Sequence, residues 1–326
     1  MKGFGKCVRA AAAGVLLAFA TQAVAVPASP PSRTETTEDV VAIPFAPPIG
    51  ETLRFRWQKT LEKDGRSVMQ WSLDDFRFEK AGEGFRLTVT PVESGSGSEE
   101  PMVKAIEQKL ADLMRRPIVL TVSADAVITD FENADAYWAT VFEAADAVIA
   151  EIGKPEALPP EMRAALAGFL KTLREMPDDA RLAMLTENVQ PLVTFAATEW
   201  SSRTPVISDL ESPSPFGPLK QEVRIALEAV ADDSATLSLH SSIPADELER
   251  IARTALAPFI EAAGKEGKPG NGTKDFGSFS HETRARTTVS LDDGLVVRHR
   301  STETIEGGEG SGLKRRVTTV SFDRVS

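Results

Sequence analysis

Cysteine is almost absent from this chain of 326 residues. The single cysteine, Cys7, precedes the first apolar run, whereas a lipoprotein cysteine would follow that run. We therefore expect Cys7 to leave with an N-terminal signal segment, so that the mature chain contains no thiol. A thiol-free chain has no disulfide, no cysteine nucleophile, no thiolate metal site and no thiol redox motif.

Histidine is scarce as well, because His240, His281 and His299 are the only three in the chain. They are far apart in sequence and fit no HExxH or HxH pattern, so we interpret each as an ordinary strand residue. The sequence also lacks the G-x-S-x-G elbow, the calcium-loop spacing and the glycine-rich nucleotide fingerprints. Acidic doublets such as Asp232-Asp233 fall at turns, where aspartate is favoured for local hydrogen bonding. We predict no catalytic residue, no metal and no cofactor.

Apolar runs long enough to span a bilayer are absent too. Residues 10–20 form an apolar run of signal-peptide length, after a basic start and before the small residues Ala23-Val24-Ala25. We predict a bacterial signal peptide over residues 1–25, cleaved after Ala25, and a periplasmic or secreted protein without a transmembrane segment. An uncleaved N-terminal anchor is the alternative.

The charge balance is acidic, with 37 basic and 48 acidic residues and a net charge of −11. Cleavage after Ala25 removes Lys2, Lys6 and Arg9 and no acidic residue, which leaves 34 basic residues and a net charge of −14. A molecule of this charge does not bind nucleic acid or anionic lipid surfaces non-specifically. We predict no nucleic-acid partner.

The composition changes along the chain. Residues 26–48 are rich in Pro, Ser, Thr and Glu, and we predict a disordered leader there. Residues 49–326 form the predicted folded domain, either as one unit or as two sub-halves, 49–200 and 219–326. Residues 201–218 contain four prolines and are predicted to be a loop.

Several segments within residues 49–326 alternate between apolar and polar side chains, as Leu53, Phe55 and Trp57 illustrate. This period of two predicts antiparallel strands with one buried face. Further strands are expected over 76–78, 85–89, 118–122, 127–131, 223–227, 237–239, 280–291, 295–305 and 313–324. Helices are expected over 100–115 and 134–152 and from residues 159, 177 and 244, whereas 189–200 fits either a helix or a strand. The predicted fold class is α+β, a curved, half-barrel-like antiparallel sheet with amphipathic helices packed on one face.

Two segments repeat the order strand, acidic turn, strand: Leu120 to Ile128, and Leu291-Asp-Asp-Gly-Leu295 with its flanks. The early strand Leu53-Arg-Phe-Arg-Trp57 alternates in the same way as the strands of these segments. On these segments the chain resembles exported bacterial proteins with a half-barrel fold, such as the outer-membrane lipoprotein carrier. The resemblance implies a fold, and no binding residue of that family can be transferred to this chain.

Between such a sheet and its helices there is often an apolar cleft. Our leading hypothesis is a non-catalytic binding or envelope-maintenance protein that holds an apolar, lipid-like ligand in this cleft. The predicted lining residues are Phe55, Trp57, Phe85, Trp138 and Phe142. For each of them the alternative is plain core packing.

A second hypothesis rests on arginine. Arg284, Arg286, Arg298 and Arg300 alternate on two predicted strands and could form a positive stripe. The stripe would suit an anionic head group or an acidic partner surface, in a protein-interaction or structural module of the envelope. Its alternative is a solvated sheet face with Glu282, Glu303 and Glu306 as partners. A hydrolase with a dispersed serine, histidine and carboxylate is the third and least favoured hypothesis.

Overall fold

A computed structural model describes residues 40–63, 65–97, 115–152, 174–186, 188–212, 219–250, 278–308 and 314–325. The predicted signal peptide, residues 26–39 of the predicted leader, residues 100–114 and the segment predicted to be helical from residue 159 lie outside these ranges. Among the described helices, none has the length and apolar character needed to cross a membrane.

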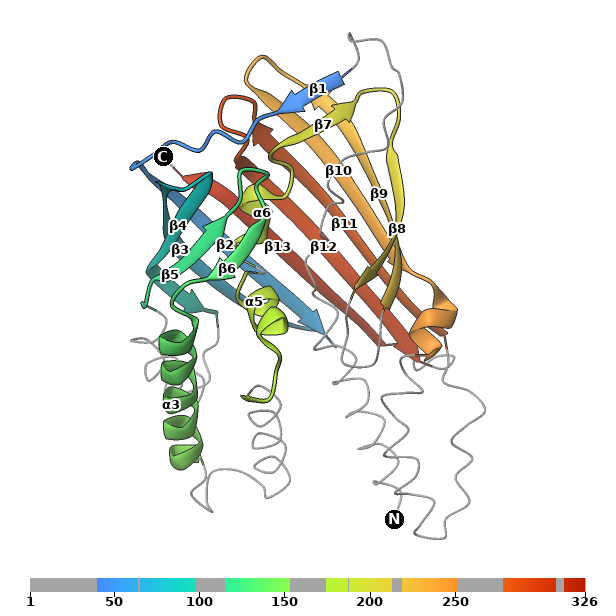
Figure 1. The fold of residues 1–326 in the computed structure, drawn as a ribbon. Coiled ribbons are helices and arrows are strands. Elements are labelled where there is room, and N and C mark those ends of the chain that lie inside the picture. The colour runs from blue at the N-terminus through green and yellow to red at the C-terminus, as the bar shows by residue number, and fades with distance from the viewer. Residues whose placement is uncertain are drawn as a thin grey trace.

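One large antiparallel sheet dominates the molecule (Figure 1). Its eleven strands have the order β6-β5-β4-β3-β2-β13-β12-β11-β10-β9-β8, and it does not close into a barrel. The strands are β2 (Thr52–Lys63), β3 (Arg66–Ala81), β4 (Gly84–Ser96), β5 (Ile118–Val122), β6 (Ile128–Phe131), β8 (Val206–Ser212), β9 (Leu219–Val230), β10 (Ser234–Ile243), β11 (Ser278–Ser290), β12 (Val296–Gly308) and β13 (Lys314–Val325).

The two halves of the chain each build one wing of this sheet. Strands β2 to β6 form the N-terminal wing and β8 to β13 the C-terminal wing, each in a meander between sequence neighbours. The wings join where β2 pairs with β13, for example through Trp57 opposite Phe322. The two predicted sub-halves therefore share one continuous sheet.

The expected α+β class is only partly correct. The antiparallel sheet is present, but the described structure is mostly β and contains few helices. The strands are longer than the alternating patterns that revealed them. Strand β3 runs from Arg66 to Ala81, although only its Phe76–Phe78 portion alternates between buried and exposed side chains. Side chains near its start are mostly exposed and carry no such pattern, so the sequence does not reveal that half of the strand.

The helices that are described agree with the predicted helical segments. Helix α3 covers Ala134–Ile152, the predicted range, and α5 covers Asp178–Thr186. The ambiguous segment 189–200 contains both a short helix, α6 (Gln190–Val193), and a strand, β7 (Thr198–Ser201). Helical hydrogen bonding also begins at Pro244, whose carbonyl accepts from the Leu248 amide.

Two predicted irregular segments contain strands, which corrects their assignment. Strand β1 (Val40–Ile43) lies within the predicted leader and pairs with β7. Strand β8 occupies residues 206–212 of the predicted proline-rich loop. Both depend on tertiary partners, since β1 is buried only through Ile43, which is 2% exposed, and β8 is held by its pairing with β9.

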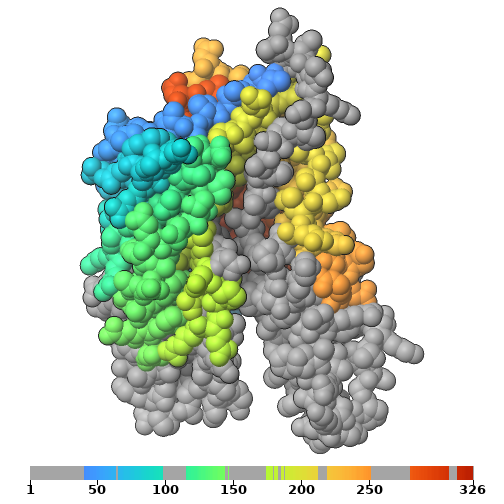
Figure 2. All heavy atoms as spheres, viewed as in Figure 1, coloured from blue at the N-terminus to red at the C-terminus, as the bar shows by residue number. Residues whose placement is uncertain are grey.

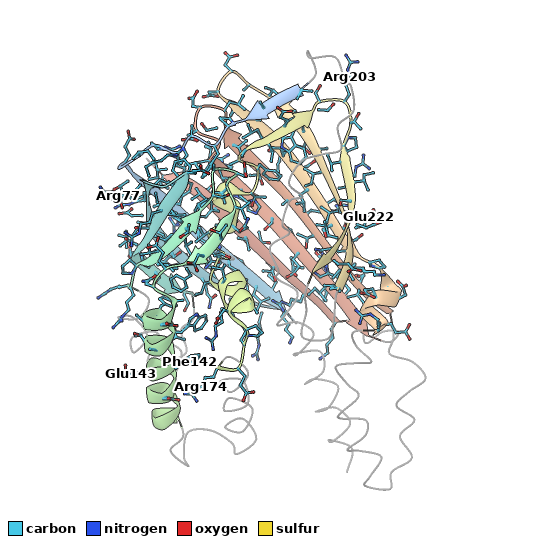
Figure 3. All side chains as sticks on the ribbon, viewed as in Figure 1. Arg77, Phe142, Glu143, Arg174, Arg203 and Glu222 are labelled. Carbon is cyan, nitrogen blue, oxygen red and sulfur yellow. The ribbon has the colours of Figure 1, made fainter. Side chains whose placement is uncertain are left out.

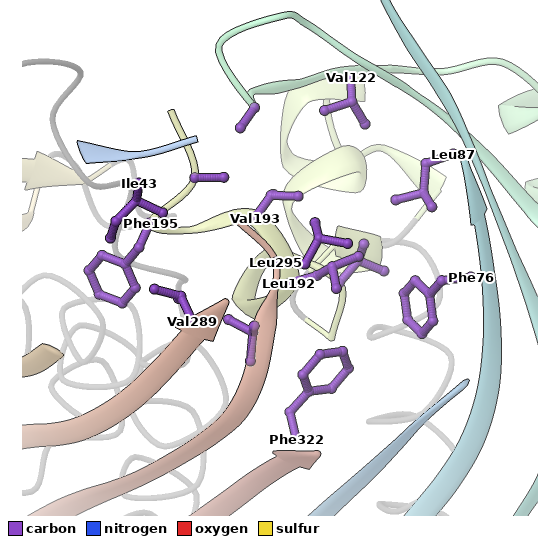
Figure 4. Packing of buried hydrophobic residues seen from close by; sticks show 14 of the residues in the cluster. Ile43, Phe76, Leu87, Val122, Leu192, Val193, Phe195, Val289, Leu295 and Phe322 are labelled. Carbon is purple, nitrogen blue, oxygen red and sulfur yellow. The ribbon is translucent and has the colours of Figure 1, made fainter. Parts of the chain in front are cut away.

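The hydrophobic core lies on the concave face of the sheet, the face that α6 covers (Figures 1 and 4). Leu192 and Val193 of α6 are buried there against the side chains of both wings. Phe55 and Phe322 stack with ring centroids 4.6 Å apart, and Phe76 meets Phe322 edge-on. This core fills the end of the concave face over which β1 and β7 lie.

The turn between β11 and β12 fastens β1 to that end of the sheet. Gly294 has a φ of 75°, and a Cβ at this position would overlap the Pro44 carbonyl oxygen. The neighbouring Ala46 amide donates a hydrogen bond to the Asp293 carbonyl at 3.0 Å. Glycine is thus required both by the backbone conformation and by the close passage of the chain.

Candidate functional site

Three of the predicted lining residues belong to the packed core. Phe55, Trp57 and Phe85 are 0%, 9% and 7% exposed, and all three are in the main hydrophobic cluster. Phe55 stacks on Phe322, and Phe85 contacts Phe45 edge-on at 5.0 Å. Protein side chains already occupy the space around these rings, so contact with a ligand stays a prediction for them.

The other two predicted lining residues lie apart from that core, on α3. Trp138 and Phe142 stack at 5.7 Å, and the guanidinium groups of Arg174 and Arg181 lie 5.5 and 5.8 Å from the centre of the Phe142 ring. Figure 3 shows Phe142 and Arg174 beside one another at α3. The structure therefore divides the five predicted residues between two places and does not gather them into one cleft.

The middle of the concave face has a different character. Across β10, β11, β12 and β13, one transverse row consists of Leu239, Ala285, Ser301 and Val320, which we call the floor row. Ala285, Ser301 and Val320 are only half-buried. The rows on either side are more deeply buried, since Phe322 is 1% exposed on one side and Thr318 2% on the other. The floor row is thus less covered than the buried rows on either side of it, and we refer to this strip of mostly small side chains as the depression.

The buried row beyond the floor row is polar. Glu303 of β12 lies opposite Thr318 of β13, and His281 of β11 contacts Glu303 diagonally, with Nε2 and Oε1 2.9 Å apart. We call these three residues the polar cluster. The His281 and Glu303 side chains are 5% and 9% exposed.

The polar cluster is incompletely hydrogen-bonded. Among the residues that the structure describes, His281 Nδ1, Glu303 Oε2 and Thr318 Oγ1 are buried atoms without a hydrogen-bond partner. A buried polar group left without a partner costs about 1–3 kcal/mol, and more when it is charged. Three such atoms in adjacent residues are unusual in a folded protein and make the polar cluster a candidate binding site.

Two further titratable groups face the concave side nearer the packed end. Burial raises the pKa of Asp74 to about 6, although Ser72 Oγ donates a hydrogen bond of 2.6 Å to its carboxylate. Burial lowers the pKa of His299 to about 4, with a further lowering from the charge of Arg300. His299 Nδ1 lies 2.8 Å from Thr287 Oγ1.

The three histidines lie on strands, as predicted, at His240 in β10, His281 in β11 and His299 in β12. Within the described part of the chain, none joins a hydroxyl to a carboxylate, because His240 and His281 contact only glutamates and His299 only a threonine. The described residues contain no group of three or more histidine, aspartate or glutamate side chains arranged to bind a metal. This geometry does not assemble the serine, histidine and carboxylate of a hydrolase.

The predicted arginine stripe lies on the outer face of the sheet, opposite the concave face. Arg286 and Arg300 are directly opposite one another on β11 and β12. Each of the four arginines has an ion-pair partner, listed here by nitrogen–oxygen distance: Arg284–Glu282 at 2.7 Å, Arg286–Glu228 at 3.0 Å, Arg298–Asp323 at 3.4 Å and Arg300–Asp323 at 2.7 Å. Since these side chains are 47–73% exposed, such pairs contribute little to stability.

The expected carboxylate partners of the stripe are only partly correct. Glu282 pairs with Arg284, whereas Glu306 pairs with Arg315. Glu303 points to the concave face, where it contacts His281. The strand alternation places Glu303 and Glu282 on opposite faces, because Glu303 lies opposite Thr283 in the ladder.

Two shallow hollows adjoin the Arg286–Arg300 pair on the outer face. The first, of about 530 Å³, lies over β9, β10 and β11, and the second, of about 440 Å³, over β12, β13 and β2; Arg300 lines both. Their combined lining includes five arginines and two carboxylates: Arg56, Arg224, Arg284, Arg286, Arg300, Glu228 and Asp323. A local positive excess on a chain of net charge −11 is a surface suited to anions.

Sequence reasoning found the outer arginines but missed the floor row and the polar cluster. A signal was present, because both alternating sets of residues 281–284 are polar, with His281 and Thr283 on one face and Glu282 and Arg284 on the other. A strand that is polar on both faces has no ordinary core side. That pattern could have indicated a polar site inside the curved sheet.

No protein-family model matches the chain, and no curated protein sequence shows significant similarity to it.

Proposed function

We propose that this chain is an exported, non-catalytic binding protein that holds an amphipathic ligand over the floor row of the concave face. The observation that carries the proposal is the depression itself, with half-buried Ala285, Ser301 and Val320 between two buried rows. Ligand sites are concave and mostly apolar, with a few polar groups that fix orientation. The floor row and its neighbours have this composition.

The surroundings of the floor row suit a ligand with an apolar part. On one side, Trp57 and Phe322 face the depression from the packed core. Across the sheet, the row continues through Lys59 of β2 to Gln70 of β3, which is exposed. The row therefore becomes polar and open toward the N-terminal wing, which gives a ligand a side from which to enter. Figure 2 shows atoms of the C-terminal strands, in red, deep between the two wings.

Export belongs to the proposal and rests on the signal-peptide pattern of residues 1–25. The resemblance to half-barrel carriers is consistent with it, since an unclosed antiparallel sheet leaves one concave face for a ligand. Periplasmic or secreted carriers of apolar molecules need no cofactor, and this proposal includes none.

Blocking the depression tests the proposal. Ser301→Trp would fill the floor row, whereas Thr302→Trp places the same ring on the outer face one residue away, at an exposed position. We expect the wild type to bind the hydrophobic fluorescent probe N-phenyl-1-naphthylamine. Ser301→Trp should weaken this binding by about tenfold or more, a loss of about 1.4 kcal/mol, and Thr302→Trp should leave it unchanged.

Two results would count against the concave-face site. One is a wild-type protein that does not bind the probe. The other is equal loss of binding in both tryptophan variants, since the Thr302 side chain is on the far side of the sheet.

The outer face supports a second candidate function, a surface for an acidic protein partner. The supporting observation is the pair of arginine-lined hollows, in which Arg224 has no carboxylate partner among the described residues. Interspersed Glu228 and Asp323 make a membrane surface a poor fit, whereas an acidic peptide can exchange with these carboxylates at individual arginines.

Charge reversal separates this candidate from a solvated sheet face. Replacing Arg284, Arg286, Arg298 and Arg300 by glutamate should abolish binding of a poly-glutamate peptide to the purified protein at low salt. The matched control reverses four arginines on β2, β3 and β4 that line neither hollow, Arg54, Arg66, Arg77 and Arg86, and should retain binding. Equal binding by the two variants would identify the stripe as a solvated face.

A further inference from the structure

We infer that the ligand of the concave face carries a headgroup with N–H or O–H donors, and that the polar cluster of His281, Glu303 and Thr318 binds this headgroup. The inference rests on the proposed function and adds the chemical class of the ligand. It uses the three buried atoms that lack partners, one on each residue of the cluster.

These atoms lie close together because the strands pair. Glu303 and Thr318 are direct neighbours across β12 and β13, and such side chains have Cβ atoms about 4.5–5.5 Å apart. His281 lies on the other side of Glu303 and contacts its Oε1 at 2.9 Å. Glu303 is therefore the centre of the cluster. One of its carboxylate oxygens accepts from His281, and the other, Oε2, has no partner among the described residues.

The unpartnered atoms of the polar cluster can accept hydrogen bonds, so they suit a ligand group that donates them. An ionised carboxylate only accepts, so with Glu303 ionised the donor in the His281–Glu303 hydrogen bond is His281 Nε2. In the neutral ring this leaves Nδ1 as a second acceptor, and the Thr318 hydroxyl can accept as well. An ammonium group placed between them would donate to Glu303 Oε2 and to one of its neighbours. A hydroxyl group, which has a single hydrogen, would donate to Glu303 Oε2 and could accept from the Thr318 hydroxyl.

The position of the cluster orients the ligand. Thr318 and Phe322 are four residues apart on the same face of β13, a separation of about 13 Å along the strand. The floor row lies between them, at Val320. A headgroup at the polar cluster thus directs an alkyl chain over the floor row toward Trp57 and Phe322, in keeping with the apolar end of the face.

Matched ligands test the headgroup separately from the chain. Displacement of N-phenyl-1-naphthylamine from the full-length protein would be measured with dodecylammonium and dodecyltrimethylammonium, and with dodecanol and dodecyl methyl ether. Each pair shares its chain and differs in donors. We expect the donor-bearing member of at least one pair to bind about tenfold more tightly, because hydrogen bonds to a charged group are the stronger kind. The two pairs distinguish an ammonium from a hydroxyl headgroup.

Two variants test whether a preference for donor-bearing ligands arises from the polar cluster. Glu303→Gln can keep an oxygen on His281 and turn an amide N–H toward the headgroup, so the preference for donors should disappear. Thr318→Val removes a hydroxyl that has no partner in the described part of the chain. It should weaken the donor-bearing ligand several-fold without lowering the melting temperature of the ligand-free protein. The neighbour Thr319, exposed on the outer face, gives the control Thr319→Val, which should change neither.

The outcomes are distinct. If the probe binds and both members of each pair displace it equally, the headgroup inference is wrong while the proposed function stands. A donor preference that survives in both Glu303→Gln and Thr318→Val would place the headgroup elsewhere and also overturn the inference. If the wild type binds no probe, the proposed function fails and the inference with it.

Discussion

Phe55, Phe76 and Phe322 form a close aromatic group at the packed end of the concave face. All three are at most 1% exposed, and their rings meet stacked or edge-on at centroid distances of 4.6–5.9 Å. Such side chains contribute through packing, and their removal leaves a cavity that the neighbours fill only partly. At the scale of the residue, these aromatic side chains of the sheet primarily stabilise the fold by packing in the core.

Phe55→Ala should therefore destabilise the protein strongly. We expect a loss of about 3–5 kcal/mol in the free energy of unfolding, measured by denaturant titration. Val297→Ala, at a position that is 37% exposed, is the control and should cost well under half as much. A loss below about 1 kcal/mol for Phe55→Ala would assign this ring to an open site and not to the core.

Gly294 allows a second residue-scale test. An alanine there combines a left-handed backbone with overlap of its Cβ and the Pro44 carbonyl oxygen. Gly65 has a similar φ of 74° with no atom near its Cβ position, so Gly65→Ala measures the backbone contribution alone, about 1–2 kcal/mol. We expect Gly294→Ala to lower the melting temperature clearly more than Gly65→Ala. Equal effects would show that β1 does not pass over this turn.

Asp74 and His299 should make stability depend on pH in opposite directions. The pKa of Asp74 is about 6 in the folded protein against 3.8, so the folded state binds more protons and stability falls as pH rises from about 4 to 6. The pKa of His299 is about 4 against 6.5, so its contribution is present above pH 6.5 and is lost as pH falls to about 4. Each shift corresponds to about 3 kcal/mol at most.

Single substitutions separate the two effects. Relative to wild type, Asp74→Asn should gain stability progressively between pH 4 and pH 6 and keep that gain at pH 7. His299→Gln should be less stable than wild type above pH 6.5. This difference in the free energy of unfolding should shrink as the pH falls from 6.5 to 4. Denaturant titrations at half-unit pH steps give both differences, and a pH-independent difference for either variant would contradict the burial assigned to that group.

At the scale of the element, β1 and β7 act as a strap over the packed end of the sheet. Ile43 is buried at 2% exposure, and Phe45 contacts both Phe78 and Phe85 edge-on. The β1 residue Val40, in contrast, is 38% exposed. The strap therefore holds by its last residues and by the chain that follows them.

Ile43→Ala tests the strap directly. Its loss of buried methyl groups should cost about 2–4 kcal/mol, whereas Val40→Ala in the same strand should cost less than about 1 kcal/mol. Amide hydrogen exchange would show whether β7 loses protection together with β1, as their pairing requires. Equal, small effects of both substitutions would mean that the strap is not part of the cooperative fold.

The elements also show which parts of the fold local sequence can predict. Helix α3 was predicted at Ala134–Ile152 because its apolar side chains recur on one helical face. The long C-terminal strands followed from alternation and from the Asp293-Gly294 turn. Strands β1 and β8 were missed because four to seven residues beside prolines carry too little pattern, and distant partners decide their conformation.

For the whole molecule, the open edges of the sheet at β6 and β8 leave one concave face shared by both wings. The aromatic residues chosen from sequence were those with the strongest apolar alternation, and this is the reason why they are in the core. The depression at the floor row depends on small side chains, such as Ala285 and Ser301, which neighbour each other only after β11 and β12 pair. No local pattern could predict that arrangement, although the polarity of His281 and Thr283 hinted at it.

Native mass spectrometry of the wild-type protein, purified under mild conditions without lipid extraction, tests the central claim most directly. We predict a mass excess from one bound amphipathic molecule, which dissociates to give a species with an alkyl chain and an N–H or O–H headgroup. Ser301→Trp, purified in parallel, should lack that excess, and Thr302→Trp should retain it. A wild-type protein that carries no adduct and also binds no N-phenyl-1-naphthylamine would contradict the account.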